Sequence, residues 1–143
     1  MKIAIGSDHG GFLLKQALAD HLAKRGFDVL DMGTNSEESV DYPVYGKKTA
    51  EAVAGGSADL GIVCCGTGIG ISIAANKVRG IRCAVVTNNY MAEMTKRHNN
   101  ANMIAFGGRV VTPEQAIEMT DIWLDTEYEG GRHARRVAML DEM

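Results

Sequence analysis

Cysteine is scarce in this 143-residue chain, which contains three, and two of them, Cys64 and Cys65, are adjacent. Three thiols cannot all pair, and neighbours in sequence rarely bridge, so the sequence indicates no disulfide framework. Reduced thiols are typical of a cytoplasmic protein. Adjacent cysteines also chelate poorly, and without a C-x-x-C or H-x-x-x-H pair the sequence predicts no metal site.

Neither sign of charge dominates. The 15 Lys and Arg residues oppose 18 Asp and Glu residues, for a net charge of −3. This balance gives no general reason to expect nucleic acid or an anionic membrane as a partner. The apolar run at residues 1–6 is too short for a signal peptide or a membrane span. Because no repeat, low-complexity tract or linker divides the chain, residues 1–143 are expected to form one domain.

Short apolar runs alternate with amphipathic stretches along the chain. The apolar runs predict strands, and the stretches with a helical apolar period predict helices. The helix from residue 113 has the most explicit start, with Thr112 as N-cap, Pro113 in the first turn and Gln115 three residues past the cap. The expected strands are 3–5, 27–32, 60–64, 83–87 and 102–106, and the other expected helices are 12–25, 43–54, 71–76, 90–97 and 132–140.

Strands separated by helical crossovers predict a doubly wound, Rossmann-like α/β fold with helices on both faces of a five-stranded parallel sheet. Ligands bind beyond the carboxyl ends of the strands in such sheets. Polar and glycine-rich residues follow four of the expected strands, at 7–11, 65–70, 88–89 and 107–109. Their convergence predicts a site at this edge of the sheet.

The segment at residues 64–70, Cys-Cys-Gly-Thr-Gly-Ile-Gly, joins an expected strand to an expected helix. Glycines let backbone amides approach a ligand, and the helix start adds partial positive charge. Both effects favour anionic oxygens and the thiolate of a nearby cysteine. From the residues alone, Cys65 is either a reactive thiol or a small buried side chain, the role expected of Cys64 and Cys83. The turn lacks the Gly-Lys-Ser/Thr of a P-loop and the spacing of a dinucleotide fingerprint.

The four histidines differ in what their surroundings suggest. His21 continues the apolar stripe of its helix and is expected in the core or at its boundary. His9 follows Asp8 in a glycine-flanked loop, which packing does not explain. His98 lies near a helix C-terminus, where it either interacts with the helix dipole or serves in the site. His133 neighbours three arginines and is compatible with a solvated position.

Arginines gather at the start of the last expected helix. Arg132 and Arg136 are one helical turn apart and share a face. Cations at a helix start oppose its dipole, so they form either a solvated basic face or a grip on an anion such as phosphate. Arg109, at the end of the last expected strand, would join such a grip.

Five segments occur together in a recognisable order: Gly-Ser-Asp-His-Gly-Gly at 6–11, Asp-Tyr-Pro at 41–43, Cys-Gly-Thr-Gly-Ile-Gly at 65–70 leading into Ile-Ala-Ala-Asn-Lys at 73–77, Arg-His-Asn at 97–99 and Gly-Gly-Arg-His at 130–133. Over nearly its whole length the chain resembles ribose-5-phosphate isomerase type B. That family includes allose- and galactose-6-phosphate isomerases. The resemblance implies interconversion of D-ribose 5-phosphate and D-ribulose 5-phosphate with no metal and no organic cofactor.

The same resemblance implies catalytic roles. Cys65 would be the base that moves a proton between C1 and C2 through an enediolate, with Thr67 assisting. His98, with Asp8 near it, would open the furanose ring. The developing oxyanion would be cradled by the backbone of Gly66, Gly68, Ile69 and Gly70.

Binding roles are implied in the same way. Tyr42 and Asn99 would contact the sugar hydroxyls. The phosphate would be held by His9, Arg109, Arg132 and Arg136.

Members of the family are dimers or tetramers whose sites combine residues of two subunits, so the last helix is expected to pack on a partner chain. Two rival functions stay open. One is isomerisation of a six-carbon sugar phosphate, such as allose or galactose 6-phosphate. The other is a non-catalytic flavodoxin-like module that senses phosphate or nucleotide, which would need the glycine turn and the arginines but not Cys65 or His98.

Overall fold

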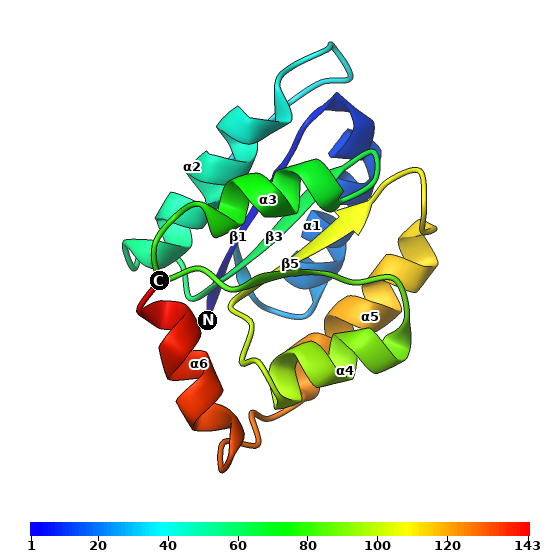
Figure 1. The fold of residues 1–143 in the computed structure, drawn as a ribbon. Coiled ribbons are helices and arrows are strands. Elements are labelled where there is room, and N and C mark those ends of the chain that lie inside the picture. Colours follow the sequence, from blue (N-terminus) through cyan, green and yellow to red (C-terminus); the bar gives the residue numbers. More distant parts are fainter.

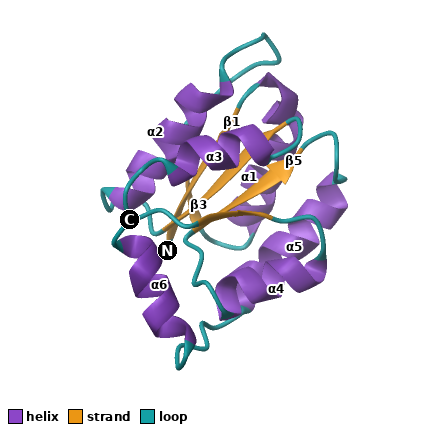
Figure 2. Ribbon diagram, viewed as in Figure 1, coloured by secondary structure: helices purple, strands orange, loops and turns teal.

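Five parallel strands form the central sheet, as the alternation of apolar runs predicts. The computed structural model describes residues 1–143 and orders the strands β2-β1-β3-β5-β4. Figure 2 shows the strands running side by side between helices. The strands are β1 (Lys2–Ser7), β2 (Asp28–Asp31), β3 (Leu60–Cys65), β4 (Cys83–Val85) and β5 (Met103–Gly107).

Helices cover both faces of this sheet (Figure 1). Helices α2 and α3 pack together on one face, whereas α1, α4 and α5 pack on the other. The last helix, α6, stands apart from both layers, near the two ends of the chain. No helix is long and apolar enough to cross a membrane. The helices are α1 (Phe12–Lys24), α2 (Tyr42–Ala54), α3 (Ile69–Asn76), α4 (Asn89–Arg97), α5 (Pro113–Asp125) and α6 (His133–Asp141), and a 3-10 turn, η1 (His9–Gly11), precedes α1.

The two faces of the sheet bury separate apolar cores, and the adjacent cysteines belong to different ones. Successive strand residues point to opposite faces, so Cys64 packs with Phe106 and Trp123, whereas Cys65 packs with Ile71. Complete burial raises the pKa of the Cys64 thiol, which therefore stays protonated at neutral pH. The packing role expected of Cys64 is confirmed.

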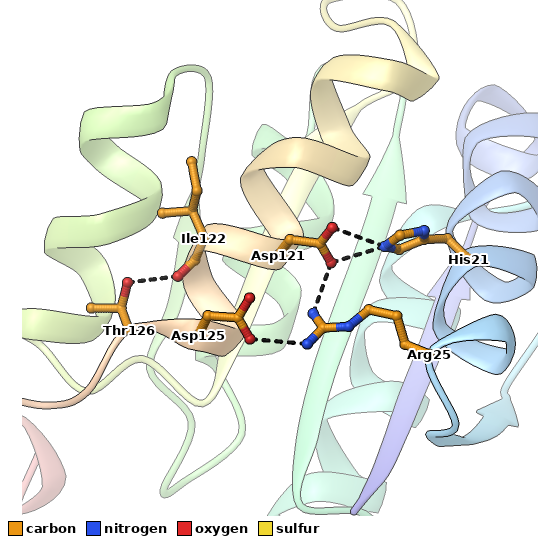
Figure 3. Close-up of polar contacts among 6 residues, drawn as sticks. All are labelled: His21, Arg25, Asp121, Ile122, Asp125 and Thr126. Atoms are coloured by element: carbon orange, nitrogen blue, oxygen red, sulfur yellow. Dashed lines mark hydrogen bonds and ion pairs between the residues drawn. The ribbon is translucent and has the colours of Figure 1, made fainter.

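Polar side chains join α1 to α5 (Figure 3), the two helices that cover the core containing Cys64. His21 Nε2 lies 2.8 Å from Asp121 Oδ1, which also accepts a hydrogen bond from Arg25 at 2.8 Å. The second amino group of Arg25 donates to Asp125 at 2.9 Å. His21 thus lies at the boundary of the core, as its place on the apolar stripe indicates, and it links α1 to α5 through Asp121.

All element ends fall within two residues of the expected positions. Thr112 and Gln115 form the expected reciprocal capping box. Strand β4 ends at Val85 rather than residue 87, and Asn88 then accepts a hydrogen bond from Met91 N and caps α4. Helix α3 begins two residues early because Gly68, at φ 81°, serves as its N-cap.

Gly68 is required in this turn by conformation and by space. A φ of 81° lies in the left-handed region, which costs a side-chain-bearing residue about 1–2 kcal/mol. A Cβ at this position would also lie 2.8 Å from the carbonyl carbon of Phe106 and 3.0 Å from the amide nitrogen of Gly107. Because both of these are backbone atoms of β5, the turn and the strand would have to separate.

We predict that Gly68→Ala lowers the free energy of unfolding by roughly 3 kcal/mol or more, as clashing core substitutions do. Gly80→Ala is the matched control, because Gly80 has a φ of 90° but nothing within 4 Å of its Cβ position. The control isolates the conformational cost and should lose only about 1 kcal/mol. Chemical denaturation of both variants measures the difference, and equal losses would contradict the close approach of the turn to β5.

Candidate active site

Cys65 ends β3 at the mouth of the glycine turn. Its side chain is 5% exposed, and its Sγ accepts a hydrogen bond from Gly68 N at 3.1 Å. The backbone carbonyls of Cys65 and Gly66 accept hydrogen bonds from Gly108 N at 2.8 Å and Arg109 N at 3.0 Å. The end of β5 thereby fixes the turn, and the turn holds the sulfur beside a backbone amide that favours negative charge on it.

Beside Cys65 lies the point where the chain changes direction in the sheet. Strand β1 leads to β2 on one side, whereas β3 leads toward β4 on the other, and β1 and β3 are neighbours. Loops leaving adjacent strands in opposite directions open a crevice at their carboxyl ends, where ligands of such folds bind. Asp8, which follows β1, donates its amide to Cys64 O at 3.2 Å, so the two strand ends are tied together.

Asp8 and His9 both organise the loop after β1. The Asp8 carboxylate is buried and accepts a hydrogen bond from Gly11 N at 3.1 Å, which starts η1. The Nδ1 atom of His9 accepts from Val40 N at 3.1 Å, so a neutral His9 ring carries its proton on Nε2. Nε2 is therefore a hydrogen-bond donor that no group of the chain occupies.

Tyr42 and Arg109 flank the turn on either side. A Cβ at Gly70 would lie 2.7 Å from two ring carbons of Tyr42, so this ring rests against the start of α3. A Cβ at Gly66 would lie 2.8 Å from Arg109 Nη1. The Arg109 guanidinium thus lies over the glycine backbone, and it forms no ion pair within the chain.

The remaining polar groups of the turn belong to α3. The hydroxyl of Thr67 accepts a hydrogen bond from Ile69 N at 3.2 Å. The amides of Gly70 and Ile71 lie in the first helical turn, where amides have no acceptor within their own helix. An anionic oxygen in front of this turn would meet those amides and the positive end of the helix dipole.

His98 and Asn99 lie at the opposite edge of the sheet. They follow α4, which returns from the end of β4 to the start of β5. Arg82, which precedes β4, donates to Asn99 O at 3.2 Å and so places this segment at the amino ends of the strands. Strand β5 begins at this edge with Met103 and ends at the other edge with Gly107, which pairs with Cys65. The four residue steps between them span about 13 Å, which is the distance between the two edges along this strand.

Arg132 and Arg136 share that second edge. Arg132 is the N-cap of α6, and the His133 ring after it stacks on His98 with centroids 4.2 Å apart and planes at 15°. At the other end of α6, Asp141 pairs with Arg82 at 2.5 Å. Both arginines are exposed and form no ion pair within the chain.

The expected site residues therefore form two groups. The carboxyl-edge group is Asp8, His9, Tyr42, Cys65, Gly66, Thr67, Gly68, Ile69, Gly70 and Arg109, and the amino-edge group is His98, Asn99, Arg132 and Arg136. The expectation that Asp8 lies near His98 is not met within one chain. The reason is topological, since α4 carries the chain across the full depth of the sheet before His98. A cavity of about 620 Å³ also lies at the amino edge, between α6 and the segment joining α3 to β4.

His133 adjoins the amino-edge group through its contact with His98, and the sequence does not reveal this position. Its three arginine neighbours suggest solvent, yet its side chain is only 8% exposed. Burial, together with the nearby His98 and Arg132, lowers the pKa of His133. The stacking joins two helices far apart in sequence, so no local pattern could signal it.

Comparison with known proteins gives consistent matches along the chain. The profile of the Ribose/Galactose Isomerase family matches residues 3–140. Ribose-5-phosphate isomerase B of Escherichia coli is 54% identical over 139 residues, which are 97% of this chain and 93% of that protein.

Two solved structures extend the likeness to three dimensions. Ribose-5-phosphate isomerase B of Clostridium thermocellum superposes with a TM-score of 0.98 at 60% identity, covering 99% of this chain and 96% of that one. The enzyme of Mycoplasma genitalium with bound ribulose-5-phosphate superposes at 0.95 with 39% identity, covering 99% and 94%. The glycine turn, the doubly wound sheet and these matches agree, and the chain belongs to the ribose/galactose isomerase family.

Proposed function

We propose that this protein interconverts D-ribose 5-phosphate and D-ribulose 5-phosphate without a cofactor, as a cytoplasmic enzyme. The observation that carries the proposal is the Cys65 sulfur, held by Gly68 N at 3.1 Å at the switch point of the sheet. The names of the relatives support the substrate, since several are ribose-5-phosphate isomerases and one structure holds ribulose-5-phosphate. The unpaired cysteines support the compartment.

An aldose–ketose shift needs a base that reaches two adjacent carbons. In the proposed reaction the Cys65 thiolate removes the proton from C2 of the open-chain aldose, and the C1 oxygen takes up the developing charge. The thiol then returns a proton to C1, and proton movement between the oxygens completes the ketose. Backbone amides of the turn would stabilise the enediolate, each well-placed donor contributing about 3 kcal/mol.

The substrate also needs to be opened and held. His98 would move the proton that opens the furanose ring, whereas His9, Arg109, Arg132 and Arg136 would bind the phosphate. Phosphate contacts lie away from the reacting carbons, so their binding energy orients the sugar over Cys65. The free Nε2 donor of His9 and the unpaired guanidinium groups support this assignment.

The two groups of site residues lie at opposite edges of one chain, so they cannot act on one sugar within a monomer. We infer that the enzyme is at least a dimer in which the amino-edge group of one subunit meets the carboxyl-edge group of its partner. The exposed arginines of α6 and the separation of this helix from both layers support the inference. Two-fold symmetry would then build two equivalent sites.

The substrate assignment predicts activity on ribose 5-phosphate in the presence of EDTA, at the same rate as without it. The kcat/KM for ribose 5-phosphate should be at least about 10-fold higher than for allose 6-phosphate or galactose 6-phosphate, because the six-carbon sugars bring an extra carbon into the same site. A coupled assay on the three sugars measures both. Equal or higher kcat/KM on a six-carbon sugar would transfer the assignment to that substrate.

The cysteine mechanism predicts that Cys65→Ser lowers kcat on ribose 5-phosphate by about 1,000-fold, because a hydroxyl is a far weaker acid than a thiol. Cys64→Ser is the matched neighbour and should keep kcat within a few-fold if it folds, which circular dichroism checks. Ribose 5-phosphate should also slow alkylation of Cys65, whereas a nucleotide should not. Near-normal turnover of Cys65→Ser, or protection by nucleotide alone, would contradict the mechanism.

The shared site predicts that two inactive variants restore each other. In a mixed dimer of Cys65→Ser and His98→Asn, one site receives both substitutions and the other keeps both native side chains. Refolding an equal mixture should recover about a quarter of wild-type activity, because half the dimers are mixed and each has one intact site. If the site lay within a single chain, every site would carry one substitution and the mixture would stay inactive.

A further inference from the structure

His98, Glu129 and His133 bring their ligand atoms together at the amino edge. One nitrogen of each ring and a carboxylate oxygen of Glu129 all lie within 4.8 Å of one another. The backbone holds this cluster, since Glu129 N donates to Arg97 O at 3.0 Å, next to His98. Because all three residues belong to one chain, every subunit would contain the cluster regardless of its assembly.

The His133 ring is the unexplained member. Its Nε2 atom is buried and has no hydrogen-bond partner, and the nearest acid, Glu129 Oε1, is 3.7 Å away. Buried polar atoms in folded proteins almost always have a partner, so this nitrogen is available to a ligand, ion or water that the chain itself does not supply. This nitrogen points into the group formed with Glu129 and His98.

Two imidazoles and a carboxylate are a ligand set for zinc and similar divalent transition metals. A tetrahedral zinc ion with bonds of about 2.0–2.1 Å places its ligand atoms about 3.4 Å apart. The pair His133 Nε2–Glu129 Oε1, at 3.7 Å, is already close to this separation. The in-plane lone pairs of two nearly parallel rings cannot meet at one ion, so His98 must leave its stack on His133 to bind the metal. Glu129 is exposed and His98 is half-buried, so both side chains have room to turn toward the buried ring of His133. Three protein ligands leave a fourth position open.

Nearby positive charge sets the expected strength of the site. Arg132 and Arg136 lie close enough to influence His133. Their charge opposes a cation, so binding should be weaker than that of structural zinc sites, which carry anionic thiolates.

We propose that His98, Glu129 and His133 form a binding site for a divalent transition metal such as Zn²⁺. The metal is not required for the reaction proposed above. Resting on that proposed function, the consequence is inhibition, because a nitrogen lone pair of His98 bound to a metal cannot take part in ring opening. The bound metal would then occupy His98 and withdraw it from the proposed reaction.

The test measures zinc binding directly, by isothermal titration calorimetry with ZnCl₂ on the metal-free full-length protein. Glu129→Gln removes one ligand charge but no group assigned to the sugar, and the Glu129 carboxylate forms no hydrogen bond to His98, so metal-free kcat/KM should stay within a few-fold of wild type. Its affinity for zinc should fall at least about 10-fold. Glu127→Gln, two residues earlier and also exposed, is the charge-matched control and should bind zinc as the wild type does. Cys65→Ser should also retain binding, which excludes the thiol as the ligand.

Inhibition of isomerase activity by zinc should follow the zinc affinities of these variants. Zinc should inhibit the wild type and the Glu127→Gln protein equally, and Glu129→Gln should require at least about 10-fold more zinc. Wild-type affinity in Glu129→Gln, or loss of binding in Cys65→Ser, would overturn the metal site. Absence of isomerase activity would instead overturn the proposed function and leave the calorimetric result intact.

Discussion

The parallel pairing of β1 with β3 is the constraint on which the candidate site depends. The register sets Ser7 opposite Cys64, and Asp8 N then donates to Cys64 O at 3.2 Å. Since strand side chains alternate, a slip of one residue would exchange the two cysteines between the cores. Cys65 would then face α1 and α5 rather than the glycine turn. The register therefore decides which of two adjacent thiols is available for chemistry.

An ion pair between α1 and β2 supports the loop that carries His9. Lys15, fully buried, pairs with Asp31 at 2.6 Å, and the same carboxylate oxygen accepts from Gly33 N at 2.9 Å. The chain at Gly33 exchanges backbone hydrogen bonds with Ser7, at 2.7 and 2.8 Å through Gly33 O and Thr34 N. Only the lysine of this pair is buried, so losing the carboxylate would leave the Lys15 charge in the core without a partner. The structural effect of the pair is to tie α1, β2 and the end of β1 into one unit next to the loop that carries His9.

Local patterns in the sequence predict local structure well here. The capping box at Thr112, the alternation that separates Cys64 from Cys65 and the glycine turn all depend on residues within a few positions of one another, and all are confirmed. The strand order is different in kind, because β5 inserts between β3 and β4 through contacts between distant segments. The division of the site follows from that order and from the direction of α4. Periodicity therefore predicts that His98 ends a helix but not at which edge of the sheet the helix ends.

The unpaired arginines would repel one another if the site were formed between two chains, as proposed above. In the proposed assembly, Arg132 and Arg136 of one subunit approach Arg109 and the positive end of α3 in the other. These charges repel one another until an anion lies between them, so a dianionic phosphate removes the repulsion that opposes association. Whatever binds only the assembled site stabilises the assembly by mass action. In the proposed assembly, substrate binding and subunit association would therefore be coupled, and the phosphate would help to hold the dimer as well as to orient the sugar.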